Sequence, residues 1–139
     1  MRVVGAGILG PKATVPPLLR EVAIHRTCAL VGAEYEWGVH AAGFGRPLGF
    51  TDEQLRSTVN GASTDACWDP DAAAVFRLCD ELHDSGNISD EHWGDLAARF
   101  EQRQVLELIV TVGWYHLICF VCNGAGVELE DWAERFPAR

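Results

Sequence analysis

The sequence predicts an all-α fold, for three reasons. Apolar residues recur at helical spacing in six segments, capping signals separate these segments, and no stretch shows the alternation of a strand. The 139 residues, 48% of them hydrophobic, suit one domain with a core of its own. We expect residues 1–13 to form a flexible N-terminal arm and residues 14–139 to form a single helical domain.

The first helix is expected at residues 15–31. Pro16 and Pro17 suit a first helical turn, where a missing backbone N–H costs nothing, and apolar residues then recur near the helical period. Gly32 follows directly and should end the helix.

The second helix should begin near residue 33 and end before Gly49. Glu34 and Glu36 would lie in its first turn, where the positive end of the helix dipole favours carboxylates. Glu36 and His40 stand four residues apart, so that they share one helical face and can meet. The sequence therefore predicts a carboxylate next to an imidazole.

Capping signals mark four further helices. Thr51 and Gln54 have the spacing of a capping box, Asp69 precedes Pro70 as an N-cap, and Ser89 is the next N-cap. The expected ranges are about 52–60, 70–85, 90–100 and 101–123.

The last of these helices is almost entirely apolar over residues 105–122, apart from Glu107 and His116. Because its length barely meets the thickness of a bilayer, we interpret it as a core helix and expect no membrane contact. A helix that is apolar almost all round needs cover on every side, which a second subunit would supply most simply. The sequence thus predicts an obligate homo-oligomer.

Charge and cysteine content limit the possible partners and compartment. A net charge of −9 argues against nucleic acid, whose binding requires clustered Lys and Arg. Five cysteines, an odd number, without a persuasive signal peptide suggest reduced thiols and a cytoplasmic location.

The chain resembles the carboxymuconolactone decarboxylase and alkyl hydroperoxidase D (AhpD) superfamily over roughly residues 15–130. The resemblance rests on LLREVAIHR leading into GAEYEWGVHAAG, on GFTDEQL, on DELHDSGNISDEHW, and on QRQVLELIVTVGWYH followed by NGAGVELE. It implies an AhpD-like helical bundle that assembles as a trimer or hexamer, with its site in a helical pocket near subunit contacts.

The resemblance also places a site. The hydroperoxidase branch carries a glutamate, then Cys-x-x-Cys-x-x-x-His; here the glutamate matches Glu21, the histidine matches His40, and the cysteine positions fall on Ala33 and Glu36. Peroxide reduction by a dithiol needs one thiolate to attack and a second thiol to resolve, so it is not expected at this place. The decarboxylase branch instead implies decarboxylation or proton transfer on a small cyclic or anionic organic substrate, without a thiol, metal or cofactor.

In this hypothesis His40 donates or accepts the proton, Glu36 tunes its pKa, and Glu21 orients or relays. The competing interpretation is that the glutamates only complement the helix dipole and that the histidine is satisfied in the core. The side chains expected to contact the substrate are Tyr35, Trp37, Tyr115 and His116.

Two alternatives to this chemistry stay open. Cys119 and Cys122 form a Cys-x-x-Cys, which would permit a thiol peroxidase, although late in an apolar helix they are better interpreted as packing residues. A non-catalytic member that binds a small molecule is the other alternative. Among the remaining histidines, we expect His25 at a surface or subunit contact, and His83 and His92 in solvent.

Overall fold

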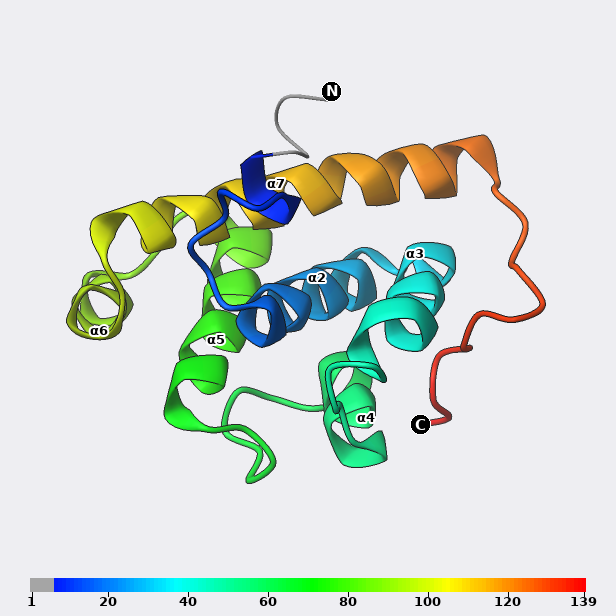
Figure 1. Ribbon diagram of the computed structural model, residues 1–139, viewed down its shortest axis with the longest axis horizontal. Helices are drawn as coiled ribbons and strands as arrows, with labels where there is room; N and C mark the ends of the chain where they lie inside the picture. The colour runs from blue at the N-terminus through cyan, green and yellow to red at the C-terminus, as the bar shows by residue number, and fades with distance from the viewer. Residues whose placement is uncertain (1–6) are drawn as a thin grey trace.

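The computed structural model describes residues 7–139 and is helical, with no strand in that range, which confirms the all-α prediction (Figure 1). Helix α2 lies at the centre, with α7 packed along it and with α3, α4 and α5 packed against it. The elements are α2 (Pro17–Val31), α3 (Glu34–His40), the π-helical segment η1 (Ala41–Gly45), α4 (Asp52–Asn60), α5 (Pro70–Ser85), α6 (Asp90–Arg99) and α7 (Gln102–Ala125).

The ends of the helices follow the predicted caps. Gly32 takes a left-handed conformation with φ of 73°, which ends α2 and turns the chain directly into α3. Thr51 and Gln54 exchange both hydrogen bonds of the capping box at the start of α4. The side chains of Asp69 and Ser89 accept hydrogen bonds from backbone amides in the first turns of α5 and α6. Local sequence therefore determines where each of these helices begins.

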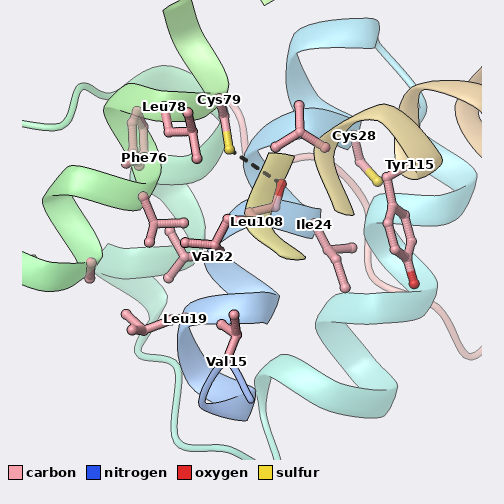
Figure 2. Packing of buried hydrophobic residues seen from close by; sticks show 14 of the residues in the cluster. Val15, Leu19, Val22, Ile24, Cys28, Phe76, Leu78, Cys79, Leu108 and Tyr115 are labelled. Atoms are coloured by element: carbon pink, nitrogen blue, oxygen red, sulfur yellow. Dashed lines mark hydrogen bonds between the residues drawn. The ribbon is translucent and has the colours of Figure 1, made fainter. Parts of the chain in front are cut away.

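The hydrophobic core lies where α2 meets α5 and α7. Figure 2 shows Val22 of α2 on the side of Phe76 and Leu78, and Ile24 on the side of Tyr115. Phe76 and Leu78 cover this part of α2 from α5, and Leu108 covers it from α7. Because these side chains are almost inaccessible to solvent, their close packing holds α7 against α2.

Within one chain, α7 is covered on one face only. Its other face leaves large apolar side chains in solvent, among them Leu106 and Phe120, each 61% exposed. By length and composition α7 is the one helix in the described part of the chain that could cross a membrane, and a third of its most apolar window is buried. Within the described chain, this face of α7 thus has no cover.

The two ends of the described chain pack against the helices. The first six positions of the expected N-terminal arm lie outside the described residues; Ile8 is buried, and its carbonyl accepts a hydrogen bond from Arg20. At the other end, residues 126–139 return along α3, where the Glu134 amide donates to the Gly38 carbonyl at 3.2 Å. Arg46 holds the Glu134 carboxylate through Nε and Nη2 at 2.8 and 3.1 Å. Residues 126–139, the C-terminal tail, therefore support α3, the helix that carries His40.

Candidate functional site

Four ionisable side chains from three helices meet beside the core. His40 of α3 donates from Nδ1 to Glu21 Oε2 of α2 at 3.0 Å. Its Nε2 lies 3.3 Å from Glu36 Oε1 and 3.3 Å from the hydroxyl oxygen of Tyr115 on α7. The three residues assigned to catalysis from the sequence, Glu21, Glu36 and His40, are thus brought together, and Tyr115 joins them.

Helical spacing explains the contact between Glu36 and His40, and the turn between α2 and α3 explains the contact between Glu21 and His40. Glu36 and His40 meet because they are four residues apart on α3. Glu21 lies 19 residues before His40, and the two meet because the chain reverses at Gly32 and packs α3 back onto α2. Ala33, at the reversal, is fully buried, so a small side chain allows the helices to approach closely.

His40 is held as an imidazolium at neutral pH. Burial alone lowers its pKa, but the hydrogen bonds and charges of Glu21 and Glu36 outweigh burial and raise the pKa to about 9. Only 6% of the residue is exposed. The cluster therefore keeps a proton on a ring nitrogen, Nε2, that points toward the remaining members of the site.

Tyr115 is a neutral member of the cluster. Burial, followed by the negative charges of Glu21 and Glu36, raises the pKa of its phenol well above 10. The hydroxyl therefore keeps its proton at physiological pH. It can accept a hydrogen bond from His40 Nε2 or donate one to an oxygen that occupies this position.

His25 was expected at a surface or subunit contact, and the structure shows this to be wrong. The residue is fully buried, its Nδ1 donates to the Glu21 backbone carbonyl at 2.7 Å, and Nδ1 also lies 3.4 Å from Glu21 Oε2. Burial lowers its pKa to about 4, so the ring is neutral. Its Nε2 faces Gly45, where a Cβ would come within 3.0 Å, and has no hydrogen-bond partner among the described residues.

The cluster reaches solvent at Phe44 and Glu36. The Phe44 ring stacks on His40, with centroids 4.8 Å apart, and is itself half exposed. Phe44 belongs to η1, and π-helical turns of this kind are frequent at functional sites. Three hollows, of about 450, 280 and 360 Å³, are lined by other residues of α4, α6, α7 and the loops beside them. Phe44 is thus the partly exposed side chain that covers His40.

Three residues expected to contact the substrate lie away from the cluster. Trp37 is buried in the core, where its indole N–H donates to Thr58 Oγ1 at 3.0 Å. The Tyr35 hydroxyl points to Glu130 in solvent at 3.5 Å. His116 accepts a hydrogen bond at Nε2 from His83 Nδ1 at 2.9 Å, on the α5 side of α7. The sequence pattern of these residues predicts that they lie on helices, but it does not predict which face of α3 or α7 packs against α2.

The histidines and Phe44 show what sequence reasoning missed. His25 follows Glu21 by four residues, and Phe44 follows His40 by four, so the helical spacing was the available signal for both. His92, expected in solvent, is instead buried, with Nε2 donating to the Ala74 carbonyl at 3.0 Å.

Among residues 7–139 no three His, Cys, Asp or Glu side chains are grouped so that they could hold a metal ion.

No family model and no curated protein matches the sequence. The fold is similar to the crystal structure of a protein of unknown function from Agrobacterium tumefaciens, for which an antioxidant defence role of the AhpD type has been suggested. The TM-score is 0.82 at 11% sequence identity, over 93% of this chain and 87% of the other. This likeness confirms an AhpD-like fold, and at such low identity it shows the fold alone.

Proposed function

We propose that this AhpD-like protein uses the cluster of Glu21, Glu36 and His40 for thiol-independent acid–base chemistry on a small cyclic or anionic organic substrate. The proposal depends on one observation: a nearly buried imidazole lies between two carboxylates, at 3.0 and 3.3 Å. Because its pKa is raised to about 9, His40 is charged before the substrate arrives, so it acts first as a proton donor.

The geometry suits a reaction that moves a proton onto a developing negative charge. In a decarboxylation, the C–C bond to the carboxylate breaks, CO₂ leaves, and the electron pair passes into a conjugated carbonyl. The Nε2–H of His40 would give its proton to that electron-rich product, while Glu21 holds the opposite ring nitrogen. Tyr115 would donate a further hydrogen bond to the carbonyl oxygen. Solvent then returns a proton to His40 through Glu36, the more exposed of the two carboxylates.

The positions that the resemblance assigns to a dithiol support chemistry without sulfur. Ala33 is a buried methyl group, and Glu36 contributes a carboxylate that contacts His40. Neither can attack a peroxide, whereas Glu36 can take part in proton transfer.

A non-catalytic binding protein is the second candidate. The favouring observation is that only 6% of His40 is exposed and that the Phe44 ring stacks on it, so little of the imidazole is open to a substrate. Such a cluster would serve as a rigid polar support between α2 and α3 rather than as a reaction site.

A deuterium-exchange experiment tests the proposal. The protein is incubated in D₂O with a panel of small unsaturated lactone carboxylates and β-keto acids, and mass spectrometry and NMR follow loss of CO₂ and deuterium incorporation at carbon. We expect turnover of at least one class, reduced by about 10²–10⁴-fold in His40→Gln, as is usual when a general acid is removed. The matched control is His83→Gln, which alters an exposed histidine on α5.

The result divides the two candidates. Turnover that falls in His40→Gln but not in His83→Gln supports the acid–base proposal. Equal turnover in the wild type and His40→Gln would reject His40 as the proton donor, and binding without turnover across the panel would reject the proposal in favour of the binding protein.

A further inference from the structure

Two cysteines that are far apart in the sequence are in contact inside the protein. Cys119 of α7 donates its S–H to Cys28 Sγ of α2, and the sulfur atoms are 3.5 Å apart. Both residues are fully buried. Figure 2 shows the Cys28 sulfur beside the ring of Tyr115, so this contact adjoins the His40 cluster without belonging to it.

This contact changes the interpretation of the Cys-x-x-Cys sequence. The spacing suggests that Cys119 would pair with Cys122, but Cys119 points into the core toward α2, while Cys122 is only half buried. A disulfide has an S–S distance of about 2.05 Å and requires close, suitably directed β-carbons. The sulfurs of Cys28 and Cys119 already touch across two helices that pack along their lengths, so they must approach by about 1.5 Å more.

We propose that Cys28 and Cys119 are a redox-sensitive pair that a hydroperoxide converts to a disulfide joining α2 to α7. The first sulfur attacks the peroxide, so that the O–O bond breaks, an alcohol leaves and a sulfenic acid forms. The second sulfur attacks that sulfenic sulfur and expels water. In total the two thiols lose two electrons and two protons, and the hydroperoxide becomes one alcohol and one water.

The surroundings of the pair determine how fast this reaction is. Burial and the nearby charges of Glu36 and Glu21 raise the pKa of Cys28 well above its usual range. Because the thiolate is the nucleophile, oxidation is slow at neutral pH and accelerates by about tenfold per pH unit. The pair is thus suited to sustained oxidant exposure and not to rapid peroxide turnover.

The consequence of oxidation is a covalent link between residues 91 positions apart. A link of that length restricts the unfolded chain strongly, so the oxidised protein should melt on the order of 10 °C higher than the reduced protein. It also ties the helix that carries Glu21 to the helix that carries Tyr115.

The test uses the folded full-length protein and hydrogen peroxide. After incubation at pH 7.5 and 8.5, the protein is denatured, free thiols are alkylated, and a non-reducing peptide map is recorded by mass spectrometry. We expect the thiols to fall from five to three, with the peptides of Cys28 and Cys119 linked and 2 Da lighter. Dithiothreitol should restore both the five thiols and the original melting temperature.

Two substitutions serve as matched controls. Cys122→Ser removes the competing partner of Cys119 and should leave the link intact. Cys79→Ser removes a buried thiol that donates to the Ala23 carbonyl on the other side of α2, as Figure 2 shows, and should also leave it intact. Cys28→Ser and Cys119→Ser should each abolish it. The map of the wild type decides the outcome even if either of these two variants fails to fold.

The contrary outcomes are equally definite. A link between Cys119 and Cys122 would overturn the proposal. So would oxidation confined to the partly exposed Cys67 and Cys122, with Cys28 and Cys119 still free after prolonged treatment at pH 8.5.

Discussion

The rings of His25 and His40 lie edge to face, with centroids 6.2 Å apart, and the same glutamate, Glu21, contacts both of them. They nevertheless differ in charge at neutral pH: the His40 ring is positively charged and the His25 ring is neutral. Hydrogen bonds to the carboxylates of Glu21 and Glu36 outweigh the effect of burial on the pKa of His40, whereas His25 is fully buried, lies 3.4 Å from Glu21 Oε2 and stays neutral. The carboxylate hydrogen bonds of His40 thus separate a charged imidazole from an uncharged core residue.

This difference predicts a stability maximum near pH 6.5. The folded-state pKa of His40 is raised to about 9, so its contribution is complete below pH 6.5 and is lost as the pH rises through 9. The folded-state pKa of His25 is lowered to about 4, so the unfolded chain takes up a proton first and stability falls between pH 6.5 and 4. Each of these two titrations changes the free energy of unfolding by on the order of 3 kcal/mol.

Urea unfolding from pH 4 to 10 measures this dependence. His40→Gln should flatten the curve between pH 6.5 and 9, and His25→Gln should flatten it between pH 4 and 6.5. His83→Gln, at an exposed site, should leave both limbs as in the wild type. A wild-type free energy of unfolding that stays constant from pH 6.5 to 9 would contradict the charge assigned to His40.

The charge of Glu36 should control the titration of His40. Glu36→Gln keeps a side chain of the same size but removes the carboxylate 3.3 Å from Nε2, so we expect His40 to titrate at least about one pH unit lower. NMR of the imidazole resonances measures this directly. The control is Glu34→Gln in the same first turn of α3, which should change the midpoint little. Equal effects of the two variants would mean that the dipole, and not the contact, sets the pKa.

Gly38 should be irreplaceable for the packing of the tail. A Cβ there would overlap the backbone carbonyl of Glu134, which cannot move without releasing residues 126–139 from α3. We expect Gly38→Ala to lower the free energy of unfolding by about 1–3 kcal/mol. Gly43→Ala meets no atom within 4 Å and should be neutral or slightly stabilising. Chemical denaturation compares the two variants, and a neutral Gly38→Ala would show that the tail contributes little.

The exposed apolar face of α7 is the reason why we still predict a homo-oligomer. Leu106, Val110, Gly113, Leu117 and Phe120 are spaced alternately by four and three residues, which is the pattern of a helical seam that packs against another helix. We expect α7 of a second copy to be the partner, because two copies of this seam match in length and in apolar character.

Sedimentation tests this at micromolar concentration. The wild type should exceed the 15.2 kDa of one chain, and Leu117→Glu combined with Phe120→Glu should reduce it to the monomer. Trp132→Glu, which alters an exposed apolar residue outside the seam, should leave the assembly unchanged. A wild type that sediments as a monomer would remove the prediction.

The sequence by itself determined the helices and the local pairs. Caps such as Thr51 with Gln54 and the turn at Gly32 depend on residues within a few positions, so they could be predicted with nearly correct bounds. The contact of Glu36 with His40 is equally local. The resemblance added Glu21 to this pair, although no spacing rule relates residues 19 positions apart.

Only the tertiary structure decided which helix faces meet. Periodicity shows that a face is apolar but not which neighbour covers it, and for this reason Trp37 and His116 were expected beside the substrate and lie elsewhere. The packing of α7 along α2 and beside α3 brings Tyr115 to His40, 75 residues away, and Cys119 to Cys28, 91 residues away. Such contacts result from the packing of whole helices, because each helix presents several similar faces and the fit of the complete core selects one.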